Sequence, residues 1–337
     1  MRIAAARGHN MNPRPPMPVA PLITRRHLAG MAVAAFQPAA SRREEILRRM
    51  QMVMGPFPAH PKANLHVEVT EERAGDGYRI ALISYAAESG DRVTAYLLAP
   101  AKPLPSRPAV VCLHPTSPLG KGVPAGLGGL PNRNYAVELA QRGFVTLAPD
   151  YPGSGGYQFN AYARGYASAT MKGIWNHIRA VDLLEARPDV HPGRVGAIGH
   201  SLGGHNALFL AAFDERVRAT VTSCGFTAFA RYKGGDLTGW SHRGYMPRIA
   251  EVYGKSPAKM PFDFDDVLEA IAPRPVFVSA PVRDDNFDAA GVVEAIESAS
   301  ERVETRITLR QPDAGHDFPL ETREEAYQFL AGALTAA

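Results

Sequence analysis

The sequence predicts an α/β domain with a doubly wound, mostly parallel sheet that is preceded in the chain by an antiparallel edge. From residue 109 onward, short apolar runs rich in β-branched residues alternate with helical patterns, separated by glycine or proline, as in parallel strands buried on both faces. Three earlier apolar runs are typical of an antiparallel meander. The 337 residues are 45% hydrophobic and 21% charged, which suits a globular domain with a sizeable core.

The antiparallel part comes first in the chain. Residues 41–54 have the pattern of an amphipathic helix, and a proline-rich bridge follows them. Strands are expected at 65–70, 78–85 and 93–99. Together they predict one antiparallel edge of the sheet.

The parallel part begins at residue 109. We expect its strands at 109–113, 145–148, 195–198, 219–223, 276–279 and 306–309. Helices are expected at 135–142, 172–186, 202–212, 292–300 and 324–333. Crossovers between parallel strands are right-handed almost without exception, so the site should lie at the carboxyl ends of the strands.

One connection, residues 226–268, is much longer than the others. It is rich in aromatic residues, among them Tyr232, Trp240 and Tyr245. A structureless loop of this length is uncommon, so we expect it to contain helices of its own. Its place beyond the carboxyl edge favours a lid or cap whose aromatic side chains contact substrate; the alternative is a structural excursion on the side of the domain.

Residues 1–40 form a basic leader. Thr24, Arg25 and Arg26 precede an apolar run at 28–36, and Gln-Pro-Ala-Ala-Ser follows. This order resembles a twin-arginine export signal, and the apolar run is well short of the about 20 residues that span a bilayer. We therefore expect a leader at 1–40, a single domain at 41–337 and an enzyme that works in the periplasm or outside the cell. The alternative is an unstructured tail.

The charge distribution argues against a nucleic-acid partner. The formal net charge is +4, but the leader holds five arginines and no acidic residue, which leaves 32 basic and 33 acidic residues in the domain. A nearly neutral domain lacks the basic surface that polyanions require. We expect neither nucleic acid nor a stable membrane anchor as a partner, and the sequence does not determine the oligomeric state.

The chain has two cysteines, Cys112 and Cys224, both in apolar runs. They could form at most one disulfide. Two buried free thiols are the simpler interpretation.

The strongest motif is Gly-His-Ser-Leu-Gly-Gly at residues 199–204, between a predicted strand and a predicted helix. A serine at such a turn is exposed at the sheet edge, and glycines are needed two places on either side because strand and helix approach closely. The motif identifies Ser201 as a candidate nucleophile.

A serine nucleophile needs a base, and the base needs an acid that holds its tautomer. His316 lies just beyond the last predicted strand and is the candidate base. The loop after strand 276–279 supplies the acid. Asp284 is the first choice because it lies a short turn beyond the strand, and Asp285 is the alternative.

An oxyanion hole needs two backbone donors, each worth roughly 3 kcal/mol of transition-state stabilisation. The amide of Leu202, directly after the nucleophile and at a helix N-terminus, is the first candidate. The loop after strand 109–113 reads His114-Pro115-Thr116. Because proline has no N–H, Thr116 is the second candidate, while His114 either contacts substrate or only shapes the loop.

These motifs, with Ala-Pro-Asp-Tyr-Pro-Gly at 148–153 and Ala-Gly-His at 314–316, resemble the α/β-hydrolase superfamily. Within it the chain is most similar to bacterial dienelactone-hydrolase-like and acetylxylan-esterase-like enzymes, over residues 92–334. The resemblance implies a triad of Ser201, Asp284 and His316. Dienelactone hydrolases carry cysteine at the elbow, so the serine here argues against lactone chemistry.

The resulting hypothesis is a serine esterase that acts through an acyl-enzyme on a small-molecule or saccharide ester, with carbohydrate acetyl esters as one candidate. One alternative is an exported peptidase of the prolyl-oligopeptidase type, for which Tyr232, Asp236 and Tyr245 would bind the peptide N-terminus. The other is a ligand-binding protein without catalysis. No metal or cofactor is expected, since no ligand spacing or phosphate loop occurs in the sequence.

Overall fold

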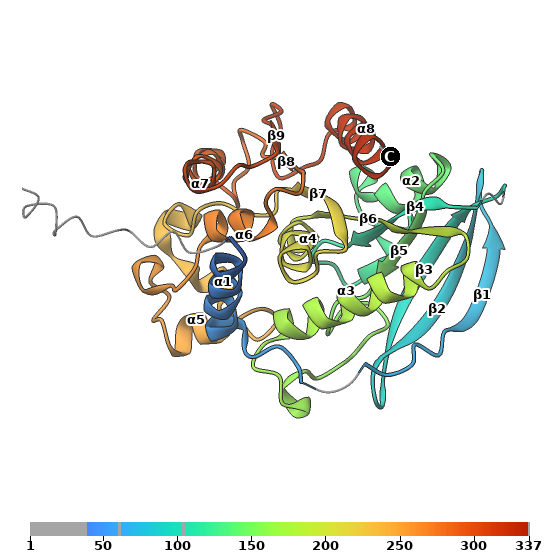
Figure 1. Cartoon of the computed structure of the whole chain (residues 1–337), viewed down its shortest axis with the longest axis horizontal. Coiled ribbons are helices and arrows are strands. Elements are labelled where there is room, and N and C mark those ends of the chain that lie inside the picture. Colours follow the sequence, from blue (N-terminus) through green and yellow to red (C-terminus); the bar gives the residue numbers. More distant parts are fainter. Residues whose placement is uncertain (1–38, 60–61, 103–104, 336–337) are drawn as a thin grey trace, which may run out of the picture. The chain divides into compact units, whose positions relative to one another are not determined.

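The computed structural model describes residues 39–59, 62–102 and 105–335 (Figure 1). The expected leader lies outside this range except for its last two residues. Within the described chain a nine-stranded sheet has the order β1-β2-β3-β5-β4-β6-β7-β8-β9. The predicted α/β class, with an antiparallel N-terminal edge on a mostly parallel sheet, is confirmed.

The antiparallel edge consists of β1 (Glu68–Ala74), β2 (Tyr78–Glu88) and β3 (Asp91–Pro100). The first strand was expected at 65–70 but begins at Glu68. Every residue of β1 is exposed, so burial of the apolar residues at 65–67 does not define this strand; its pairing with β2 does. Charged side chains on an outer strand also discourage pairing with other chains.

The parallel strands pair in the order β5-β4-β6-β7-β8-β9. They are β4 (Arg107–Leu113), β5 (Val145–Pro149), β6 (Val190–His200), β7 (Val217–Ser223), β8 (Val276–Ser279) and β9 (Ile307–Arg310). The chain runs from β4 to β5 on one side, and then to β6 on the other side of β4. This reversal between β4 and β6 is a topological switch point, where open α/β sheets bind their ligands.

Helices cover both faces of the sheet. Figure 1 shows α2 (Tyr135–Gln141) and α8 (Leu320–Thr335) on one face, and α3 (Ala169–Glu185) and α4 (Leu202–Phe213) on the other. Two separate clusters of buried apolar residues fill the layers between helices and sheet. Burial on both faces explains why the central strands are continuous apolar runs.

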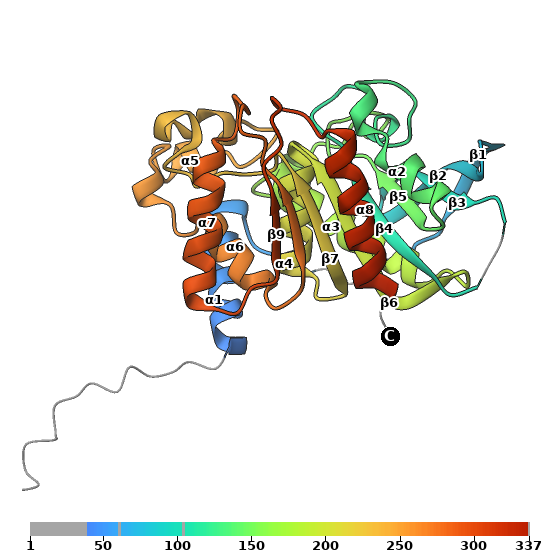
Figure 2. The same cartoon turned by 90° about the horizontal axis from the view of Figure 1, so that it is seen from above.

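Further helices extend the second layer beyond α4. α1 (Ala39–Met54) buries Ile46, Met50 and Val53 at helical spacing. It packs on α6 (Phe264–Ile271), which in turn packs on α7 (Ala289–Arg302). Figure 2 shows these helices together at the edge of the sheet remote from β1. None of the described helices has the length and apolar character needed to cross a membrane.

The segment 226–268 contains short helices of its own, as predicted. They are η4 (Tyr232–Gly235), η5 (Leu237–Trp240), α5 (Arg248–Glu251), η6 (Pro257–Lys259) and the start of α6. Its aromatic side chains pack mainly against one another and against α4: the ring of Phe264 lies 5.8 Å from that of Phe209 and 5.5 Å from that of Trp240. Much of the segment therefore packs against α4, and its role as a lid stays a prediction.

Candidate active site

Ser201 occupies the sharp turn between β6 and α4. Its backbone angles, φ 54° and ψ −117°, lie in a region that residues other than glycine seldom adopt. A Cβ on Gly199 would lie 2.1 Å from the carbonyl oxygen of Gly203, and one on Gly203 would lie 2.0 Å from that of Leu113. The two glycines are thus required because strand and helix touch at this point.

Three side chains from three loops form a continuous hydrogen-bonded chain. Ser201 Oγ lies 2.9 Å from His316 Nε2. His316 Nδ1 lies 2.9 and 3.0 Å from the two carboxylate oxygens of Asp284. With Asp284 ionised, Nδ1 carries the proton and donates a hydrogen bond to the carboxylate. Nε2 is then free to accept a hydrogen bond from the serine hydroxyl.

The local structure selects Asp284 over its neighbour. The Asp284 carboxylate is buried and accepts the amides of Asn286 at 2.8 Å and Phe287 at 3.1 Å. Burial raises the pKa of Asp284, but the hydrogen bond from His316 and the two amides outweigh it and leave the pKa below its usual range. Asp285 is exposed, and its backbone carbonyl accepts the Lys233 ammonium. The structure therefore brings Asp284, and not Asp285, to His316.

A pocket of about 250 Å³ opens directly at the serine. Its walls are Pro115, Thr116, Ser117, Val123, Gly129, Leu130, Arg133, His200, Ser201 and His316. Thr116 thus lines the same pocket as the nucleophile. Leu202 is the first residue of α4, so its amide has no partner within the helix. That the amides of Leu202 and Thr116 bind the oxyanion stays a prediction.

His114 does not face this pocket. Its ring is buried, and Nε2 accepts the amide of Tyr151 at 3.0 Å. Nδ1 must then carry the proton, and it donates to the carbonyl of Pro115 at 2.7 Å. The expectation that His114 contacts substrate therefore gives way to the alternative: the imidazole shapes the loop that carries Thr116.

The carboxylate of Asp150 anchors another wall of the pocket. Asp150 directly follows β5 and is fully buried. It accepts the backbone amide of Lys121 at 2.8 Å, its ammonium at 2.6 Å and the hydroxyl of Thr94 at 2.6 Å. These bonds attach the segment that includes Val123 to the end of the sheet.

Sequence reasoning missed Arg133, whose side chain is only 4% exposed. Its guanidinium donates to the backbone carbonyl of His316 at 3.0 Å and to the carboxylate of Asp317. Asn132 also donates to Asp317, at 2.7 Å, and accepts a hydrogen bond from Arg323 at 2.9 Å. The position of Asp317, directly after His316, was the one sequence signal for this network.

The residues of the 226–268 segment that were expected to contact substrate lie in different surroundings from one another. Tyr232 and Trp240 are buried in the aromatic cluster of the 226–268 segment, and neither lines the serine pocket. The hydroxyl of Tyr245 lies 2.9 Å from Thr116 Oγ1. Asp236 caps η5 through the amide of Thr238. Of this group, Tyr245 alone comes close to the pocket wall.

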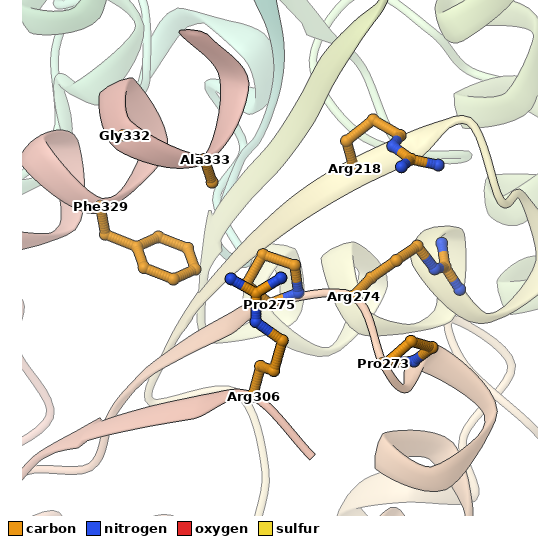
Figure 3. A pocket seen from close by; sticks show the side chains of 8 residues that line it. All are labelled: Arg218, Pro273, Arg274, Pro275, Arg306, Phe329, Gly332 and Ala333. Atoms are coloured by element: carbon orange, nitrogen blue, oxygen red, sulfur yellow. The ribbon is translucent and has the colours of Figure 1, made fainter. Parts of the chain in front are cut away.

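A second pocket, of about 410 Å³, lies at the opposite ends of the strands (Figure 3). Arg218, Arg274 and Arg306 line it with Phe329 and small residues from the starts of β7, β8 and β9 and from α8. Its lining contains no serine, cysteine, histidine or carboxylate. This pocket therefore offers no nucleophile or base.

Known sequences are similar to this chain over much of its length. The model of the prolyl oligopeptidase family, Peptidase_S9, matches residues 132–334. The chain is 25% identical over 311 residues to "Putative hydrolase YtaP" of Bacillus subtilis (strain 168), which covers 86% of this chain and 98% of that protein. It is 26% identical over 200 residues to carbohydrate esterase MZ0003 from an unknown prokaryotic organism, which covers 54% of this chain and 45% of that protein.

Solved structures share the fold. The glucuronoyl esterase from Solibacter usitatus superposes with a TM-score of 0.67 at 20% identity, over 87% of this chain and 92% of that chain. Acetyl xylan esterase 1 from Thermoanaerobacterium sp. JW/SL YS485 superposes with a TM-score of 0.60 at 18% identity, over 89% and 99%. Both agree with the predicted architecture.

Proposed function

Because this chain belongs to the prolyl oligopeptidase family of α/β-hydrolases, we propose that it is a serine hydrolase whose substrates are carboxylic esters with a small acyl group. The observation that carries the proposal is the hydrogen-bonded chain from Ser201 through His316 to Asp284 at the mouth of a 250 Å³ pocket. Pockets for drug-sized ligands usually span about 300–1,000 Å³, so this one suits a short acyl chain.

The reaction has two half-steps. His316 Nε2 takes the hydroxyl proton as Ser201 Oγ attacks the ester carbonyl, and Asp284 stabilises the resulting imidazolium. The amides of Leu202 and Thr116 receive the developing oxyanion. His316 then gives the proton to the leaving alcohol, and an acyl-serine remains. Water, activated by the same imidazole, hydrolyses the acyl-serine and restores the enzyme.

We propose a carbohydrate ester as the substrate. Two features support this: the similarity to carbohydrate esterase MZ0003 over 200 residues, and a pocket lining of mixed polar and apolar residues that includes Thr116 and Ser117. Such a wall can hydrogen-bond hydroxyl groups next to the scissile ester.

A peptidase is the second candidate, because the matching family is described as prolyl oligopeptidase. A peptide N-terminus would need an anionic partner, and the lining of the serine pocket contains no carboxylate. Asp236 is occupied by capping η5, and Tyr232 is buried. These placements favour esters over peptides.

The test compares hydrolysis of p-nitrophenyl acetate, longer acyl homologues, acetylated xylo-oligosaccharides and amino-acid p-nitroanilides. Wild type should prefer acetyl esters, and Ser201→Ala should lose activity by several orders of magnitude, up to about 10⁶-fold. A fluorophosphonate should label Ser201 in wild type. Faster cleavage of anilides than of esters would favour the peptidase, and an inert, unlabelled Ser201 would refute a hydrolase of either kind.

We further propose export through the twin-arginine pathway, on the ground of Arg25 and Arg26 before the apolar run. Full-length protein should collect in the periplasm of a bacterial host, and the double change Arg25→Lys with Arg26→Lys should retain it in the cytoplasm. Cell fractionation with activity staining gives the result. Equal distribution of both forms would contradict export by this route.

A further inference from the structure

The mechanism does not use the thiol of Cys224, which lies beside the triad. Cys224 directly follows β7, and its amide donates to the carbonyl of Ser279 at 2.9 Å, which extends the pairing between β7 and β8 by one step. It is buried and not part of a disulfide. Its φ of 46° is unusual for a residue with a side chain, and such outliers concentrate at functional sites.

This thiol, the Asp284 carboxylate and the His316 imidazole each offer a ligand atom, and these three atoms all lie within 4.8 Å of one another. Zinc bonds are about 2.3 Å to sulfur and about 2.0–2.2 Å to nitrogen and oxygen. The ligand atoms of a tetrahedral zinc site are therefore somewhat closer together than this limit. Three protein ligands plus one open position form a common zinc arrangement. The donor set therefore fits a thiophilic divalent cation.

We propose that Cys224, Asp284 and His316 form an inhibitory binding site for Zn²⁺ or a similar thiophilic divalent cation. The inhibition rests on the proposed function, since two of the ligands are triad members, but binding of the ion does not. His316 lines the serine pocket, and Asp284 lines a neighbouring surface pocket of about 510 Å³.

Proton positions explain how a bound ion stops the reaction. In the resting triad Nδ1 of His316 carries the proton and Nε2 has the free electron pair. When the metal binds Nδ1, that proton is lost and Nε2 takes one up, so this nitrogen can no longer accept the hydroxyl proton of Ser201. Cys224 gives its thiol proton to solvent as its sulfur binds. One proton is released per ion, and the base is blocked.

The binding test does not depend on catalysis. Metal-free protein is titrated with Co²⁺, and absorption is recorded for a thiolate-to-cobalt charge-transfer band that Zn²⁺ should abolish by competition. The band should appear in wild type and in Ser201→Ala. It should be absent from Cys224→Ser, in which the hydroxyl still donates to the Asp317 carbonyl as the thiol does at 3.3 Å. Cys112→Ala, which removes the other buried thiol, is the matched control and should keep the band.

The activity test follows in the same buffers. Zn²⁺ should inhibit ester hydrolysis reversibly, a chelator should restore it, and Cys224→Ser should raise the inhibition constant at least tenfold while hydrolysis continues. Equal zinc sensitivity of wild type and Cys224→Ser, without a cobalt band, would overturn the site and leave the hydrolase intact. A cobalt band in a chain that cleaves no ester would keep the site and refute the function.

If Cys224→Ser does not fold, the double variant Ser201→Ala with Asp284→Asn provides a second test. It should bind Co²⁺ at least tenfold more weakly than Ser201→Ala, and equal binding would again overturn the site.

Discussion

The guanidinium of Arg133 holds the backbone carbonyl of His316 at 3.0 Å and also contacts the carboxylate of the next residue, Asp317. Burial raises the pKa of Asp317, but the hydrogen bonds from Arg133 and Asn132 outweigh it and keep this carboxyl ionised. The loop that carries the catalytic base is thus attached to the segment before α2.

Arg133→Ala should lower kcat about 10- to 100-fold, because a small displacement of His316 breaks its alignment with Ser201. KM should change less than kcat. Arg283→Ala is the control, since Arg283 also pairs with a carboxylate, that of Asp313 at 2.9 Å, but is exposed. Steady-state kinetics on p-nitrophenyl acetate measure both. Equal loss in the two variants would show that Arg133 has no special positioning role.

Asp284→Asn should reduce kcat by about 10⁴-fold with little change in structure. Asparagine keeps the shape and can still accept the amides of Asn286 and Phe287, but it no longer holds Nδ1–H of His316 in the productive tautomer. Asp285→Asn, one residue along the same loop, should retain activity within about twofold. If Asp285→Asn were the inactive variant, the acid of the triad would have to be reassigned.

Gly203→Ala tests the close approach of α4 to β4. The added methyl would lie 2.0 Å from the carbonyl oxygen of Leu113, so the loss of stability should reach or exceed roughly 3 kcal/mol, the upper end of the usual cost of overpacking. Gly332→Ala in α8, where no atom lies within 4 Å, should instead stabilise the chain by about 0.5–1 kcal/mol. Urea unfolding compares the two variants. Similar stabilities would mean that the elbow tolerates a side chain.

The elbow could be predicted because its requirements are local: a strand, a turn that needs glycines and a helix follow one another in a single stretch around Ser201. Other features depend on contacts between distant segments. The choice between Asp284 and Asp285 depends on the conformation of one turn, and Arg133 meets His316 across 183 positions of sequence. Likewise, the aromatic pattern around Trp240 suits a lid as well as a flank, and it could not show that these rings pack against α4.

Burial of neutral histidines predicts how stability depends on pH. His205 in α4 is enclosed by aromatic rings, with Trp240 at 4.7 Å and Phe209 at 5.7 Å between centroids. Burial lowers the pKa of His205 from 6.5 to about 3. Between pH 3 and 6.5 the unfolded chain binds a proton at His205 that the folded chain does not. The contribution of neutral His205 to the free energy of unfolding is therefore complete above pH 6.5 and is lost as the pH falls.

For one such group the free energy of unfolding should decrease by about 1.4 kcal/mol per pH unit below 6.5. His205→Phe removes the titrating group but keeps an aromatic ring. Between pH 6.5 and 4.5 the stability of this variant should therefore fall less steeply than that of wild type, and the two slopes should differ by about 1.4 kcal/mol per pH unit. Urea unfolding across this range measures the slope, and His66→Gln at an exposed position should behave as wild type. Parallel slopes for wild type and His205→Phe would mean that the folded protein binds this proton as readily as the unfolded chain does. The ring would then be accessible to solvent, which contradicts its enclosed position beneath the 226–268 segment.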